Sequence, residues 1–143
     1  MSSLRRWCYY AIRLAWVAAI VMAGCSRDKG DPEKISRDFI IGIWKQDLQR
    51  VNALTCADWR SRTAEWAQEG DPALIIDADH LEFETTTEED DMVTVVMSGV
   101  VTIRSDAGGI NEVRDFNELG AIRFILVDED GWKVCDMREQ PSD

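Results

Sequence analysis

The chain has 143 residues, of which 45% are hydrophobic, and its 16 basic and 27 acidic side chains give a formal net charge of −11. This length allows one domain with a real core but not two. The negative charge repels nucleic acid phosphates and anionic lipid headgroups, so the composition argues against nucleic acid as a partner.

The first 24 residues have the layout of a secretory signal. Arg5, Arg6 and Arg13 form a basic part, and residues 14–23 form an apolar run. That run is too short for an ordinary membrane-spanning helix, which needs about 20 residues. Small residues follow it, as they do at a signal cleavage site. Residues 1–24 are therefore predicted to be a signal peptide.

Cys25 follows Val21-Met22-Ala23-Gly24, where cleavage is expected. The segment resembles a bacterial lipoprotein signal, although Met22 replaces the usual leucine. The resemblance implies cleavage between Gly24 and Cys25, and acylation of Cys25, with palmitate among the acyl chains. It also implies anchoring to a membrane of the bacterial cell envelope, outside the cytoplasm, with residues 25–31 as lipidated cysteine and tether. The alternative is an uncleaved anchor in which Cys25 is a small apolar residue.

The lipoprotein interpretation gives each of the four cysteines a role. Cys8 leaves with the signal and Cys25 takes the lipid, so Cys56 and Cys135 remain. Disulfides persist in exported compartments, and two cysteines allow one intramolecular bond. We predict a Cys56–Cys135 disulfide. The alternative is a pair of buried free thiols.

The processed chain is predicted to open with an amphipathic helix. Asp31 is placed to cap this helix and Pro32 fits its first position. Its apolar residues recur at helical spacing: Ile35, Phe39, Ile40, Ile43, Trp44, Leu48 and Val51. Around residues 47–54 the same phase continues and favours a second short helix.

A further helix is predicted to begin at Thr55, with the Thr55 side chain as its cap. Trp59, Thr63 and Trp66 share one face of it, which is typical of core packing. Gly70-Asp71-Pro72 is expected to end the helix, with Gly70 in the left-handed conformation.

From Ala73 onward the apolar pattern changes to the alternation of strands. Strands are predicted over residues 81–86, 92–104, 117–127 and 132–137. Turns or loops are predicted over residues 88–91, 105–111 and 128–131, and a polar tail over 138–143. Helices followed by hairpin-connected strands predict a single α+β domain over residues 32–137, with the helices on one face of an antiparallel sheet.

This order of elements resembles the nuclear transport factor 2-like superfamily, a cone-shaped fold of helices against a curved sheet. The resemblance is carried by the helix Ile35 to Leu54, by residues 55–60, and by the final Asp130-Gly131-Trp132-Lys133-Val134-Cys135-Asp136. The paired cysteines look like those of small bacterial lipoproteins with this fold. Some cone-fold enzymes use Asp, Tyr or His in the cone interior for proton transfer.

Candidate catalytic residues are few. His80 is the only histidine, and it lies beside Asp77 and Asp79, so it is a candidate general base. Asp115 is a further candidate. Strand alternation, however, places His80 with Glu82 on a solvent face, and no tyrosine remains after processing. We therefore expect no catalytic residue among them.

Metal and cofactor signatures are also missing from the sequence. The acidic turns at 88–91 and 128–131 lack the ordered ligands of a calcium loop. One histidine and two paired cysteines do not make a zinc site. No glycine-rich phosphate loop or nucleophile motif is present. We expect no metal and no cofactor.

Three functions fit these observations. The first is a non-enzymatic, lipid-anchored envelope module that binds a small apolar ligand or a partner protein. The second is a small hydrolase or isomerase that uses the cone interior. The third is a structural or assembly protein that dimerises through its sheet, because the second sheet face is also predicted to be apolar, with Val96, Val100, Ile125 and Val127.

Overall fold

The computed structural model describes residues 28–105 and 111–141. The predicted signal, Gly24 and Cys25 lie outside these residues. No helix in the described part of the chain is both long and apolar enough to cross a membrane.

In the described chain the helices come first and the strands follow, except for one short helix between the third and fourth strands. The helices are α2 (Pro32–Trp44), α3 (Leu48–Leu54), the 3-10 turn η1 (Ala57–Trp59), α4 (Arg60–Gln68) and the short α5 (Phe116–Leu119). The strands are β1 (Leu74–Glu88), β2 (Met92–Ser105), β3 (Asn111–Asp115), β4 (Ala121–Asp128) and β5 (Trp132–Gln140).

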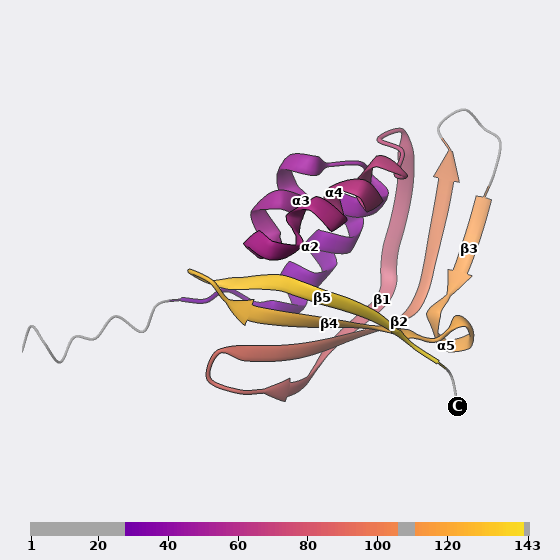
Figure 1. Ribbon diagram of the computed structural model, residues 1–143. Coiled ribbons are helices and arrows are strands. Elements are labelled where there is room, and N and C mark those ends of the chain that lie inside the picture. The colour runs from indigo at the N-terminus through magenta and orange to yellow at the C-terminus, as the bar shows by residue number, and fades with distance from the viewer. Residues whose placement is uncertain (1–27, 106–110, 142–143) are drawn as a thin grey trace, which may run out of the picture.

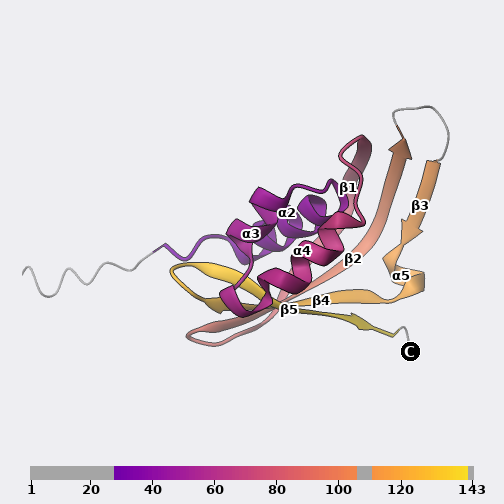
Figure 2. The same cartoon turned by 45° about the horizontal axis from the view of Figure 1, so that its top comes forward.

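The strands form one antiparallel sheet in the order β1-β2-β4-β5, and β3 also pairs with β2. The first part of β2 pairs with β4, and its last part pairs with β3. The sheet curves, and helices α2, α3 and α4 lie together on one side of it (Figures 1 and 2). The predicted fold class is confirmed: an α+β domain with N-terminal helices packed on a curved antiparallel sheet.

The core lies between α2 and the concave face of the sheet. The alternation predicted for β2 is confirmed, because its inward side chains are all buried: Val93, Val95, Met97, Val101 and Ile103. Phe39 of α2 meets Phe124 of β4 edge to face, at 6.2 Å between ring centres. Both phenyl groups are fully excluded from solvent.

Gly99 lies in the middle of β2, where β1 approaches its backbone closely. Its φ is +94°, a conformation that side-chain-bearing residues rarely adopt. A Cβ atom at this position would lie 2.2 Å from the carbonyl oxygen of His80. Glycine therefore allows the close approach of β1 at the point where β2 passes from β4 to β3.

The start of the first helix is as predicted, but the start of α4 is not. The Asp31 side chain accepts hydrogen bonds from the backbone N–H groups of Glu33 and Lys34. Thr55 does not cap α4: its hydroxyl donates to the Val51 carbonyl at 2.6 Å, and its backbone bridges to Val134. The helix begins only at Arg60, after the 3-10 turn.

Gly70 has a different role from the one predicted. It does not adopt a positive φ, so the expected left-handed helix end is wrong. A Cβ atom at Gly70 would lie 2.4 Å from the Ile43 carbonyl oxygen, at the end of α2. Glycine is needed at this position because the backbone that follows α4 lies directly against the backbone at the end of α2.

The start of β1 and the presence of β3 differ from prediction. β1 begins at Leu74 rather than Leu81, because a bulge between Asp77 and His80 interrupts the alternation. Residues 111–115, which were not predicted as a strand, form β3.

Two further boundaries differ toward the C-terminus. The strand predicted from Asn117 begins at Ala121, because Asp115 accepts a hydrogen bond from the Asn117 N–H and starts α5. Residues 138–140, expected in a polar tail, belong to β5, since they pair with β4. Their side chains are polar because they lie on an edge strand, exposed to solvent.

Candidate functional site

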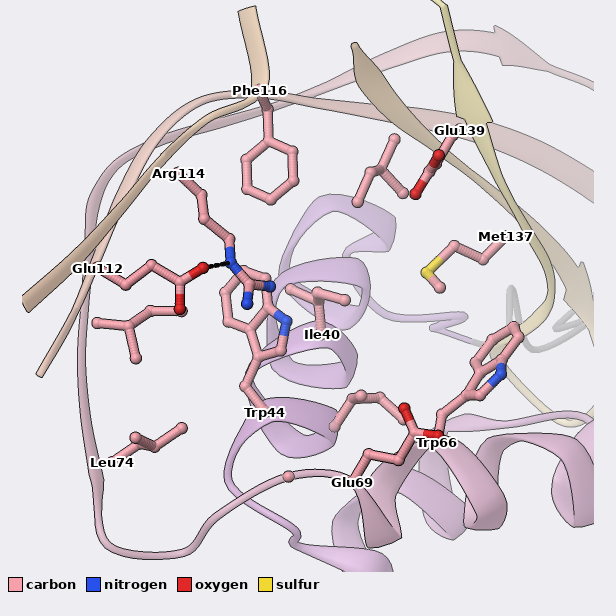
Figure 3. A pocket seen from close by; sticks show the side chains of 14 residues that line it. Ile40, Trp44, Trp66, Glu69, Leu74, Glu112, Arg114, Phe116, Met137 and Glu139 are labelled. Atoms are coloured by element: carbon pink, nitrogen blue, oxygen red, sulfur yellow. Dashed lines mark hydrogen bonds and ion pairs between the residues drawn. The ribbon is translucent and has the colours of Figure 1, made fainter. Parts of the chain in front are cut away.

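The described residues line an open cavity of about 510 Å³ on the concave side of the sheet. Figure 3 shows its lining side chains, which come from both helices and strands. The cavity lies between the ends of α2 and α4 and the part of the sheet where β3 and β5 flank β2 and β4.

The floor and walls of the cavity are apolar. Ile40 and Ile43 are buried one turn apart on α2, and Ile122 of β4 is also buried. Trp44 stacks on Phe116, with 6.4 Å between ring centres and 11° between ring planes. The amphipathic pattern of α2 and the inward face of the sheet together produce these walls.

Strand β3 contributes charged groups to the same cavity. Glu112 and Arg114 pair with Ile103 and Val101 of β2, whose side chains face the core, so the two charged side chains lie on the concave side. Arg114 Nε donates to Glu112 Oε1 at 2.6 Å. This hydrogen bond holds the pKa of the Glu112 carboxyl below its ordinary value.

Two further carboxylates lie at the edge of the cavity. Glu139 pairs with Ile122 across the β4–β5 ladder, and Glu69 follows the last residue of α4. Both side chains line the cavity and both are exposed to solvent. Glu69, Glu139 and the β3 residues Glu112 and Arg114 were not among the candidates expected from the sequence. The alternation of Glu112 and Arg114 was the available signal, but it is only five residues long.

The catalytic candidates chosen from sequence do not reach this cavity. Asp77, Asp79 and His80 are exposed at the bulge of β1, where the Asp79 N–H donates to Asp77 Oδ1 at 3.2 Å. Asp115 caps α5. The structure does bring Asp77, Asp79 and His80 close in one segment, but none of the candidates lines the cavity.

We expect His80→Ala to change the free energy of unfolding by no more than about 0.5 kcal/mol, the range of surface substitutions. The reason is that the His80 side chain is exposed and outside the cavity. Thermal unfolding would measure this change, beside a cellular assay of the deletion phenotype. Loss of cellular function with an unchanged melting temperature would contradict the expectation and favour His80 as a general base.

Cys56 and Cys135 form a disulfide, with 5.2 Å between their Cα atoms and a sequence separation of 79. The bond joins the segment before α4 to β5. A Glu129 oxygen lies within 4.8 Å of both sulfur atoms, and the group has the donor types of a metal site. Sulfur atoms bonded to each other are not thiolates, however, and metals bind cysteine as thiolate.

The acidic turns are occupied by contacts within the protein. Residues 128–131 form the predicted hairpin turn, in which Asp130 and Gly131 both have positive φ. Lys29 Nζ lies 3.1 Å from Asp128 Oδ2, and it also donates to the carbonyl oxygen of Asp90. One lysine therefore connects both acidic turns.

The outer face of the sheet mixes apolar and charged side chains. Val96 lies between Glu84 and Arg123 in the ladders, and Val100 lies between His80 and Asp115. All four of the predicted apolar positions are half-buried: Val96, Val100, Ile125 and Val127. A dimer through this face stays a prediction.

Comparison with known proteins identifies the fold. No protein-family model matches the chain, and no curated protein matches it. Among solved structures, the chain is similar to a ketosteroid isomerase-like protein from Erwinia carotovora atroseptica, with a TM-score of 0.53 and 14% identity over 78% of this chain and 94% of that chain. The fold is a nuclear transport factor 2-like cone.

A second similar structure is a putative calcium/calmodulin-dependent protein kinase type II association domain from Thiobacillus denitrificans. Its TM-score is 0.51, with 14% identity over 77% of this chain and 94% of that chain. At such low identity these likenesses establish the fold of this chain and nothing about its ligand or partner.

Proposed function

We propose that this domain is a non-enzymatic binding module whose cone interior holds a small, largely apolar ligand. The observation that carries the proposal is the cavity of about 510 Å³ with isoleucine and aromatic walls. Small-molecule sites have volumes of roughly 300–1,000 Å³, apolar linings and a few polar groups that fix orientation. The glutamates and Arg114 supply such polar groups here.

The same cavity argues against the alternative of a hydrolase or isomerase. Such an enzyme needs titratable groups that converge in a water-excluded site. Glu69 and Glu139 are exposed to solvent. Glu112 is held by Arg114, and its lowered pKa makes it a weaker base. These residues are better suited to orient a ligand than to take a proton from it.

Filling the cavity should weaken binding of an apolar probe. We expect Leu74→Trp to weaken binding of the neutral dye Nile red at least about tenfold, because Leu74 lines the cavity and the larger indole occupies its space. Dye fluorescence during titration is the measurement.

Ile75→Trp is the matched control, because Ile75 is the next residue of β1, is 54% exposed and does not line the cavity. It should bind the dye like the unaltered chain. Equal dye binding by the Leu74→Trp and Ile75→Trp variants would show that the dye lies elsewhere and would contradict the proposed function.

The second part of the proposal is a lipid anchor in the bacterial envelope. It is supported by the sequence of residues 21–25 and by the Cys56–Cys135 disulfide, a bond that persists in oxidising compartments. Two or more acyl chains on Cys25 would hold the acidic domain at a membrane that its charge alone would not bind.

Cys25→Ser should abolish labelling of the protein by a radioactive or clickable fatty acid, because the sulfur atom that accepts the lipid is lost. Cys8→Ser is the matched control and should keep the label, since Cys8 precedes the expected cleavage point. Equal label in the unaltered chain and in Cys25→Ser would rule out lipidation at this cysteine.

A further inference from the structure

The charges that line the cone cavity are unbalanced. Three carboxylates, Glu69, Glu112 and Glu139, line it together with a single cation, Arg114. Arg114 lies 2.6 Å from Glu112, so these two charges offset each other. Among residues 28–105 and 111–141, Glu69 and Glu139 have no ion pair or side-chain hydrogen bond. The cavity therefore keeps two negative charges without a partner.

The two glutamates reach the cavity from different elements. Figure 3 shows Glu69 coming from the end of α4 and Glu139 coming from β5, with the side chains of Met137 and Trp66 between them. Both side chains are exposed, so neither carboxylate carries the cost of burying a charged group. A positively charged group that enters the cavity therefore meets an unpaired carboxylate at either of these two edges.

The walls favour an organic cation over a metal ion. Trp44, Trp66 and Phe116 present aromatic side chains to the cavity. Aromatic faces attract ammonium and guanidinium groups and also bury apolar area. A hard metal ion instead requires six or more oxygen ligands, which an isoleucine and tryptophan lining does not provide.

We propose that the ligand of this cavity is an amphipathic organic cation, with an apolar or aromatic body and one ammonium or amidinium group. The inference rests on the proposed function and specifies its ligand class. The body packs against Ile40, Ile43 and Trp44, and the cation lies at the edge of the cavity beside Glu69 or Glu139. The net charge of −11 also draws cations toward the chain from solution.

Three probes with one naphthalene body test this ligand class: naphthylmethylammonium, naphthylmethanol and naphthoate. Isothermal titration calorimetry with the full-length chain would measure their affinities at low and high salt. We expect the cation to bind about tenfold more tightly than the neutral probe at low salt, and the anion to bind most weakly. Added salt should reduce the differences in affinity among the three probes, because salt screens charges on exposed carboxylates.

Single substitutions test which side chains cause the preference for the cationic probe. Glu69→Gln and Glu139→Gln should each weaken binding of the cation about threefold and leave the neutral probe unchanged. Glu84→Gln is the matched control: it makes the same change in net charge, and Glu84 is exposed on β1 beside Val96, away from the cavity lining. It should bind the cation like the unaltered chain.

Several outcomes would overturn the inference without touching the proposed function. Equal affinity for cation and neutral probe would show that the glutamates do not select charge, and tighter binding of naphthoate would assign the site to Arg114 and an anion. An equal loss in Glu84→Gln would attribute the preference to net charge. Failure of all three probes to bind would also overturn it, and the Nile red test then decides separately whether the cavity binds ligands at all.

Discussion

Phe124→Ala should lower the free energy of unfolding by about 3–5 kcal/mol, the usual cost of cutting a buried phenylalanine to alanine. Phe124 is fully excluded from solvent, and its ring contacts Phe39 of α2 and Phe83 of β1 at 6.2 and 6.3 Å between ring centres. The substitution would thus leave a cavity where helices and sheet meet. A loss of this size is a large fraction of the roughly 5–15 kcal/mol that stabilises a domain.

Urea denaturation followed by circular dichroism measures this loss. Arg123→Ala is the matched control, because Arg123 is the preceding residue of β4 and is exposed. It should cost less than about 1 kcal/mol. If Phe124→Ala does not fold, Phe124→Leu keeps most of the volume and should show a smaller loss. If Phe124→Ala lowers the free energy of unfolding by less than about 1 kcal/mol, the Phe124 ring does not stabilise the core as expected.

Cys135→Ala should lower the free energy of unfolding by about 4 kcal/mol under oxidising conditions, because the disulfide no longer restrains the unfolded chain. The estimate follows from the 79-residue separation of the two cysteines. Under reducing conditions the variant and the unaltered chain should have nearly the same unfolding midpoint, since neither has the bond.

Cys56→Ala is the matched control for that experiment. It should lose as much as Cys135→Ala, and the double variant should lose little more, because both substitutions remove one bond. Mass spectrometry of the protein, purified without reducing agent, should detect the linked Cys56 and Cys135 peptides. Two alkylatable thiols in that material would refute the disulfide.

The fold was predictable wherever one periodic pattern runs without interruption. β2 is a long run rich in β-branched residues, and its buried apolar side chains fall on alternate positions, so both its extent and its inward face follow from that pattern. β1 was predicted too short because the bulge at Asp77 and His80 shifts the alternation. β3 was missed because it is short and carries Val113, 63% exposed, between two charged residues.

The site was much less predictable than the fold. Glu69, Arg114 and Glu139 come from three elements that lie far apart in sequence, and no local motif marks any of them. They line one cavity because the sheet curves and because the ladder registers point Arg114 and Glu139 toward its concave side. Which distant residues line the same cavity depends on the tertiary structure, and the local spacing of residues along the chain does not reveal it.

The disulfide also closes most of the domain into a covalent ring. η1, α4, β1, β2, β3, α5 and β4 all lie between Cys56 and Cys135, whereas α2 and α3 precede the ring. A single proteolytic nick in the turn between β1 and β2 would therefore open the ring without producing two separate fragments. The two pieces would stay joined through the Cys56–Cys135 bond.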